Sequence, residues 1–256
     1  MVHFVGAGCG AADLITLRGA RLLEEADVVI YAGSLVNPEL LERCKPGCEI
    51  YNSAKMTLEQ TTAVIAAAEV AGKTTVRLHT GDSSIYGAER EQFDELIPRA
   101  IEYEVTPGVR AFGGAAAALK QEFTLPGVSQ TVIITRQSGR TAVPERERIR
   151  SLAAHRATMV LYLSTGLTEE LQQELLSGGY PGSTPAAVVF KASWPDERIF
   201  HCTVDTLHQC VTENHLTRTS LIIVGDCMGD TYAKSFLYDP SYERPFQEAA
   251  TLPEGL

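Results

Sequence analysis

The first 120 residues alternate short apolar segments with segments of helical periodicity, and this alternation constrains the fold more than any other feature. The apolar segments have the length and composition of strands and lie at Val2–Val5, Val28–Tyr31, Thr74–His79 and about Tyr103–Val105. Helical segments separate them, so neighbouring strands can be joined by crossover connections. Because such connections place helices on the faces of a parallel sheet, we expect an α/β fold with a mostly parallel sheet over residues 1–120.

Two helices in this region carry capping signals. Asp13 can cap a helix that reaches about Ala26. Its expected apolar stripe consists of Leu14, Leu17, Leu22 and Leu23. Thr57 and Gln60 have capping-box spacing, and the helix they open is expected to end at Gly72. Both helices fit between strands of the same sheet.

The second half of the chain has more strands for each helix. Strands are expected at Thr131–Thr135, Met159–Leu163, Ala186–Phe190, Arg198–Val204 and Ser220–Val224. Helices are expected at Pro144–Ala154, Thr168–Leu176 and Thr206–Glu213. This pattern predicts a second α/β domain with a mixed sheet over 121–239, after a boundary near residue 120. Residues 240–256 are expected to form a loosely packed tail.

Charge and composition exclude several classes of protein. Lys and Arg number 22 against 32 Asp and Glu, which gives a net charge of −10 and argues against a nucleic-acid partner. No apolar stretch approaches the roughly 20 residues of a membrane span, so no membrane partner is expected. The N-terminal segment is typical of a strand and a glycine loop, not of a secretory signal. Six cysteines without a C-x-x-C pair favour reduced thiols and a cytoplasmic location.

The first glycine loop, Gly6-Ala7-Gly8-Cys9-Gly10-Ala11, lies between a strand and a helix and satisfies the G-x-G-x-x-G/A pattern. This pattern is typical of a dinucleotide-binding turn, in which a pyrophosphate lies on a helix N-terminus. Such a site also needs an acidic residue at the end of the next strand, and Tyr31-Ala32-Gly33-Ser34 contains none. An NAD-dependent oxidoreductase therefore stays an alternative only, and a tight packing turn explains the glycines equally well.

Two further loops follow strands of the first sheet. The loop from His79 to Gly87 contains Asp82, which can accept hydrogen bonds from ligand hydroxyls or close a turn, and the spacing leaves both interpretations open. Thr106-Pro107-Gly108 leads into a helix of small residues at 111–120, where either a ligand or a neighbouring element comes close.

Basic and histidine-rich segments in the second half are candidates for anion and metal sites. Arg136 and Arg140 follow a strand in a Gly-Ser loop and are candidates for anion contacts, whereas the arginines of 146–156 are typical of a solvated helix face. His201, His208 and His215 are seven residues apart, which matches no common ligand spacing. We expect no metal site.

The three loops, in this order, resemble those of the tetrapyrrole (precorrin) methyltransferase family. The family patterns V-G-A-G-P-G-D, G-D-P and V-P-G-V correspond to residues 5–11, 81–83 and 106–109, with Cys9 and Ser83 in place of two prolines. Four further segments are similar to the precorrin-4 C11-methyltransferase branch of cobalamin (corrin ring) biosynthesis: Tyr31–Pro38, Tyr51–Ala54, Val128–Thr131 and Lys191–Glu197. The resemblance extends over residues 1–235.

This resemblance implies a homodimer of two-domain subunits, with S-adenosyl-L-methionine bound in the cleft between the two α/β domains. The residues that it implies for the cofactor site are Cys9, Thr80, Gly81, Asp82, Ile85, Tyr86, Arg110, Ala111, Leu163 and Ala192. At Leu163 the correspondence could shift by one residue to Ser164. A branch that methylates uroporphyrinogen has an acid, proposed as a base, at about the position of Ala32, so no catalytic base is assigned here.

The implied reaction is methyl transfer from S-adenosylmethionine to C11 of precorrin-4, which gives precorrin-5 and S-adenosylhomocysteine. A cobalt-containing form of the substrate and a non-catalytic tetrapyrrole carrier remain alternatives. Because the substrate is a polycarboxylate, cations are expected to line its trough despite the protein's negative charge. The candidates for this role are Lys55, His79, Arg110, Arg136 and Arg140.

Overall fold

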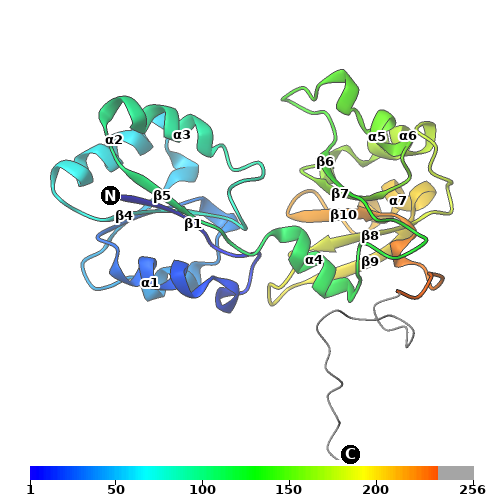
Figure 1. Ribbon diagram of the computed structural model, residues 1–256, viewed down its shortest axis with the longest axis horizontal. Helices are drawn as coiled ribbons and strands as arrows, with labels where there is room; N and C mark the ends of the chain where they lie inside the picture. The colour runs from blue at the N-terminus through cyan, green and yellow to red at the C-terminus, as the bar shows by residue number, and fades with distance from the viewer. Residues whose placement is uncertain (236–256) are drawn as a thin grey trace, which may run out of the picture.

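The computed structural model describes residues 1–235. The first half of these residues forms a five-stranded parallel sheet (Figure 1). Its strands are β1 Val2–Gly6, β2 Val28–Tyr31, β3 Glu49–Asn52, β4 Thr75–His79 and β5 Tyr103–Thr106. They lie in the order β3-β2-β4-β1-β5, and every neighbouring pair is parallel. The parallel sheet predicted from the alternation of strands and helices is therefore confirmed.

The second sheet also has five strands, but their directions are mixed. They are β6 Val132–Arg136, β7 Thr158–Tyr162, β8 Pro185–Phe190, β9 Arg198–Thr203 and β10 Ser220–Val224. Their order is β6-β7-β10-β8-β9; only β6 and β7 are parallel neighbours, and the other pairs are antiparallel. The mixed sheet is confirmed, whereas the tail predicted at 240–256 lies outside the described residues.

Helices cover both sheets. Those of the first half are α1 Leu17–Glu25, α2 Leu58–Val70, α3 Glu89–Leu96 and α4 Ala111–Leu119. Those of the second half are α5 Ile149–Ala153, α6 Thr168–Ser177 and α7 Leu207–Glu213. The capping box is confirmed, since Thr57 Oγ1 accepts from Gln60 N at 3.2 Å and Gln60 Oε1 accepts from Thr57 N at 2.9 Å. None of the helices within residues 1–235 is long and apolar enough to cross a membrane.

The start of α1 differs from the prediction. Its N-cap is Thr16, whose hydroxyl accepts from Gly19 N at 3.0 Å, while Asp13 lies in a separate 3₁₀ turn, Ala12–Leu14. Leu17 consequently points into solvent with 93 % of its surface exposed, whereas Leu23 is fully buried. Thr and Asp are both good N-caps, so local sequence alone could not choose between them.

Two other elements differ from the prediction: strand β3 was not predicted, and one predicted helix is divided in two. Strand β3 lies at the edge of its sheet, and its first two residues are exposed, so it carries no apolar run for a pattern search to detect. The helix expected over Pro144–Ala154 is divided into a 3₁₀ turn, Glu145–Glu147, and α5, because Arg148 has extended backbone angles.

Helix α4 packs against the second sheet, although it precedes the predicted boundary near residue 120 (Figure 1). Ala115 and Leu119 share an apolar cluster with Val160 of β7 and Ile223 of β10. Small side chains allow this close approach of helix and sheet. The exact domain limits stay a prediction, but α4 is structurally attached to the second half.

Candidate functional site

The three glycine loops interlock at the carboxyl ends of the adjacent strands β4, β1 and β5. Gly8 and Gly81 exchange backbone hydrogen bonds of 3.2 and 2.8 Å. A Cβ on Gly6 would lie 2.6 Å from the Gly81 carbonyl oxygen, and one on Gly108 would lie 2.1 Å from the same atom. Only glycine lets these three backbones meet, so close packing explains part of the glycine pattern.

Asp82 ties the second loop to the third. One of its carboxylate oxygens accepts from Gly108 N at 3.0 Å, and the other accepts from Arg110 Nε at 3.2 Å and from the Ser84 hydroxyl. Burial raises the pKa of Asp82, but the hydrogen bonds from Ser84 and Gly108 and the charge of Arg110 outweigh it and lower the pKa below its ordinary value. The Asp82 carboxylate therefore joins the second and third loops. Because Asp82 also lines the cavity next to these loops, its contact with a ligand stays a prediction.

A cavity of about 540 Å³ lies between the two sheets, next to these loops. All ten residues expected to contact the cofactor line it: Cys9, Thr80, Gly81, Asp82, Ile85, Tyr86, Arg110, Ala111, Leu163 and Ala192. Residues that sequence reasoning missed also line it, among them Tyr162, Thr165, Val189, Lys191, Trp194, Arg218 and Leu221. Lys191 and Trp194 belong to a segment used for the family resemblance; no sequence signal marked the others.

Side chains from the two sheets meet at one side of the cavity. The rings of Tyr86 and Tyr162 lie 5.5 Å apart, and the Tyr162 hydroxyl accepts from Phe112 N, at the start of α4, at 3.1 Å. Leu163 follows β7 with a φ of 53° and is 67 % exposed, whereas the Ser164 hydroxyl is turned inward and accepts from a backbone N–H. Leu163, not Ser164, lines the cavity.

The cavity lining is locally positive. Its charged residues are Arg110, Lys191, Arg218 and Asp82. Arg110 is bonded to Asp82 and Ser84, and Lys191 forms an ion pair of 2.6 Å with Asp196. Arg218 is exposed and makes no side-chain hydrogen bond or ion pair with any residue in the described part of the chain. A positive lining in an acidic protein agrees with the expectation for a polycarboxylate ligand.

His79 was expected to bind anions, and the structure contradicts this. Its side chain points into the core from the central strand β4 and stacks on Phe4 with ring centroids 6.0 Å apart. Burial lowers the pKa of His79, and the positive charge of Arg77 lowers it further, to about 3. The imidazole is therefore neutral at physiological pH. A neutral, buried ring cannot serve as a cation for a carboxylate in the cavity.

The other predicted anion contacts are separated by the fold. Arg136 donates to the carbonyl oxygen of Thr141 at 2.9 Å and to those of two other residues of its own loop, and it does not line the cavity. Lys55 and Arg140 are exposed and also lie outside the lining. Arg110 is the one predicted anion contact that the described structure places there.

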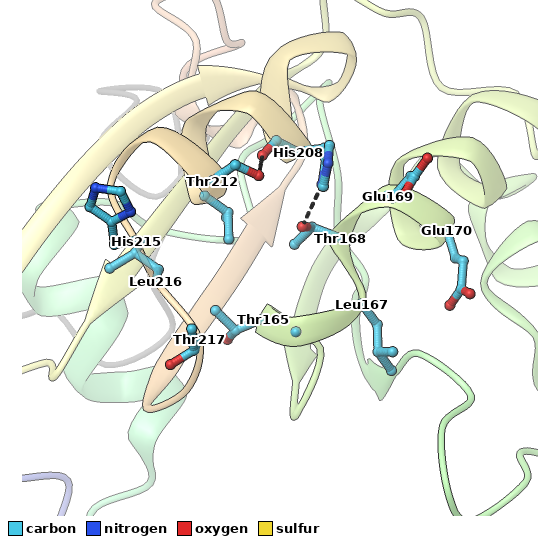
Figure 2. Close-up of a pocket in the computed structure, with 12 residues that line it drawn as sticks. Thr165, Leu167, Thr168, Glu169, Glu170, His208, Thr212, His215, Leu216 and Thr217 are labelled. Carbon is cyan, nitrogen blue, oxygen red and sulfur yellow. Dashed lines mark hydrogen bonds between the residues drawn. The ribbon is translucent and has the colours of Figure 1, made fainter.

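The three spaced histidines are not brought together. His208 contacts the Thr168 hydroxyl at 3.1 Å in a separate pocket of about 460 Å³, and His215 lies on the other side of that pocket (Figure 2). His201 is exposed on β9. Within residues 1–235 the structure contains no group of three His, Cys, Asp or Glu side chains that could hold a metal ion.

The structure is that of an α/β protein whose candidate ligand site lies between two sheets. Interlocked glycine loops border this cavity. The family model for tetrapyrrole (corrin/porphyrin) methylases matches residues 1–208. The chain is 49 % identical to a cobalt-precorrin-4 C(11)-methyltransferase of Methanocaldococcus jannaschii, over 97 % of this chain and 96 % of the relative. It is 45 % identical to a precorrin-4 C(11)-methyltransferase of Mycobacterium tuberculosis, over 93 % and 95 %. The chain belongs to the tetrapyrrole methylases.

Solved structures agree with this assignment. A cobalt precorrin-4 methyltransferase of cobalamin biosynthesis superposes with a TM-score of 0.88 at 41 % identity, covering 90 % of this chain and 96 % of the other. A uroporphyrin-III C-methyltransferase of Thermus thermophilus in complex with S-adenosylhomocysteine superposes with a TM-score of 0.74 at 27 % identity, covering 89 % and 93 %. These likenesses give no support to the alternative of an NAD-dependent oxidoreductase.

Proposed function

We propose that the protein transfers a methyl group from S-adenosylmethionine to C11 of precorrin-4 in cobalamin biosynthesis. The observation that carries this proposal is the convergence of all ten expected cofactor residues on one cavity between the sheets. The M. jannaschii and M. tuberculosis relatives are named as C(11)-methyltransferases of cobalt-precorrin-4 and precorrin-4, which supports the substrate and the position of methylation.

The cavity fits the cofactor in size and in chemistry. Its volume of about 540 Å³ is within the usual range for small-molecule sites. Gly81 borders it with a backbone that carries no side chain, and Cys9 and Ala111 add only small ones, so a ligand can approach the main chain closely. We assign to the cofactor the ten expected residues, all of which are among those that line this cavity. The S-adenosylhomocysteine complex of a family member supports the identity of the cofactor.

S-Adenosylmethionine supplies an electrophilic methyl group whose sulfur leaves as a neutral thioether, and the electron-rich macrocycle is the nucleophile. The chain's own task is therefore to hold the two reactants in line and to exclude water. Apolar lining by Val189, Ala192 and Leu221 favours exclusion of water. Positioning alone can contribute about 7–11 kcal/mol to a two-substrate reaction. The position of the acid in the uroporphyrinogen branch corresponds to about Ala32 here, so we assign no base.

Carboxylates of the tetrapyrrole are proposed to contact the cations of the cavity lining. Arg110 and Arg218 lie on different elements, at the N-cap of α4 and before β10. Arginine forks suit carboxylates, and a free guanidinium needs no existing ion pair to be broken. Arg218 is therefore the stronger candidate, and Lys191 adds positive charge near it.

The substrate form with cobalt is the second candidate, favoured by the M. jannaschii relative and by the solved cobalt precorrin-4 methyltransferase. The test incubates the purified protein with metal-free or cobalt-loaded precorrin-4 and cofactor carrying a ¹³C-methyl group. A mass gain of one methyl, located at C11 by NMR, is the expected result. Methylation at another carbon would refute the regiochemistry, and binding without any mass gain would favour a tetrapyrrole carrier.

We further propose a cytoplasmic homodimer, as the family resemblance and the composition suggested. Light scattering on the purified full chain tests the oligomeric state, with twice the mass of 27.7 kDa expected. A monomer at micromolar concentration would contradict this part of the proposal.

A further inference from the structure

The segment Lys191–Glu197, here called the strap, leaves the second sheet after β8 and lies against the first glycine loop. Two of its non-glycine residues adopt left-handed backbone angles: Lys191 has a φ of 49° and Ser193 has a φ of 65°. Such angles persist only where the surrounding structure imposes them, and they concentrate at functional sites. The strap therefore has contacts strong enough to hold it in this shape.

Those contacts join the two halves of the protein. The Ser193 hydroxyl accepts from Ala11 N at 3.1 Å and lies 3.4 Å from the Cys9 sulfur. A Cβ added to Gly10 would lie 2.3 Å from Cδ1 of Trp194 and 2.6 Å from the carbonyl oxygen of Ala192. The first loop and the strap are thus packed without space for one more carbon atom.

The strap is itself held on both sides. Glu197 accepts from Ser193 N at 2.6 Å, which fixes the left-handed residue. Lys191 N donates to the Thr219 carbonyl at 3.0 Å, which attaches the strap to the segment that precedes β10. On the other side of the loop, the buried Asn37 amide donates to the Gly10 carbonyl at 3.0 Å. The first loop is therefore held between Asn37 and Ser193.

Ser193 does not line the cavity, but its neighbours do. Cys9 and Ala192 both face the cavity, one from each half of the chain. We propose that Ser193 is a positioning residue that sets the distance between Cys9 and Ala192 and thereby the affinity for S-adenosylmethionine and S-adenosylhomocysteine. This inference rests on the proposed function and adds a role to a residue that touches neither reactant in the proposed site.

The test compares three substitutions with different effects on hydroxyl and backbone. Ser193→Ala removes the hydroxyl and keeps the unfavourable φ, and Ser193→Gly removes the hydroxyl and relieves the φ. Ser193→Thr keeps the hydroxyl but makes the φ less favourable, because its side chain is β-branched. Ser151→Ala, on the exposed surface of α5, is the matched control. Calorimetric titration with S-adenosylhomocysteine, steady-state kinetics and amide hydrogen exchange of the peptide that contains Ala11 are measured for each.

We expect Ser193→Ala and Ser193→Gly to weaken S-adenosylhomocysteine binding about tenfold and to raise the KM for S-adenosylmethionine similarly, since each leaves Ala11 N unpaired. The kcat at saturating cofactor should stay within twofold. Ser193→Thr should retain more of the affinity than Ser193→Ala, because it keeps the acceptor for Ala11 N, but less than the wild type, because a β-branched residue is strained at this φ. Exchange at the Ala11 peptide should accelerate about tenfold in the Ala and Gly variants, with or without ligand.

Two results would overturn the proposal. Wild-type affinity in both the Ala and Gly variants would show that the hydroxyl has no positioning role. Recovery in Ser193→Gly alone would assign the effect to backbone strain. Failure of the wild-type protein to bind S-adenosylhomocysteine would instead refute the proposed function, and the exchange measurement would still report whether Ser193 holds the first loop.

Discussion

The carboxylate of Asp82 accepts a hydrogen bond from the backbone N–H of Gly108 at 3.0 Å, across two loops that are 26 residues apart in the chain. Asp82 also binds Arg110, the N-cap residue of α4. A single buried side chain thereby connects the loop after β4 with the loop after β5 and with the helix that packs on the second sheet. Because Asp82 and Arg110 both line the cavity, this connection forms part of its wall.

Replacing Asp82 by Asn keeps the shape of the side chain and removes its charge. We expect about 1–3 kcal/mol of lost folding stability, because charge-assisted hydrogen bonds from Gly108 and Arg110 are weakened. Affinity for S-adenosylhomocysteine should fall about tenfold, as measured by calorimetry. Asp94→Asn, which alters an exposed ion pair with Arg90, is the control and should change neither quantity appreciably. Unchanged affinity in Asp82→Asn would refute its role in the site.

Gly10 tests the close contact between the first loop and the strap. A Cβ at this position would overlap Trp194 and the Ala192 carbonyl, so Gly10→Ala should separate the two halves of the cavity. We expect a cost of about 1–3 kcal/mol from overpacking, together with weaker cofactor binding. Gly113→Ala places the same atom in open space on α4 and should be neutral or slightly stabilising. Thermal unfolding of both variants measures the difference, and equal melting temperatures would contradict the model of a packed contact.

Because His79 is buried with a lowered pKa, we expect the folding stability of the protein to depend on pH. Its pKa in the folded protein is about 3, below its ordinary value of 6.5, so only the unfolded chain takes up this proton between those two values. Its contribution to stability is complete above pH 6.5 and is lost progressively as the pH falls toward 3, by up to about 1.4 kcal/mol for each pH unit.

His79→Phe keeps a ring against Phe4 and removes this titration. Urea unfolding at pH 7.5 and pH 5 should show the variant gaining about 2 kcal/mol relative to the wild-type protein on acidification. A difference between the two proteins that does not change with pH would show that His79 is not held neutral in the fold.

Arg218 tests recognition of the polycarboxylate substrate. We expect Arg218→Ala to raise the KM for the tetrapyrrole about fivefold, since an exposed charged contact contributes about 1 kcal/mol. The effect should diminish at high ionic strength, and affinity for S-adenosylhomocysteine should not change. Arg140→Ala, at an exposed position outside the cavity, should behave as wild type. An equal change in both variants would remove Arg218 from the substrate site.

Much of the fold follows from local pattern. Four of the five strands of the first sheet, all but β3, were predictable because strand and helix periods alternate, and parallel order follows from crossover connections. The capping box at Thr57 was predictable because its two hydrogen bonds lie within four residues. The start of α1 was not, because Asp13 and Thr16 are both competent caps and local sequence does not choose between them.

The sequence by itself determined the two α/β halves and the order of the three loops, since these depend on local periodicity and on motifs at defined spacing. The family resemblance of those motifs implied ten of the residues that line the cavity, but not the others. Only the tertiary structure decided which cations face the cavity. His79 and Arg218 are both basic in type, but the sheet buries one beside Phe4 and the turn before β10 exposes the other at the cavity. Burial and long-range contacts, which no local pattern records, set the charge and the role of each side chain.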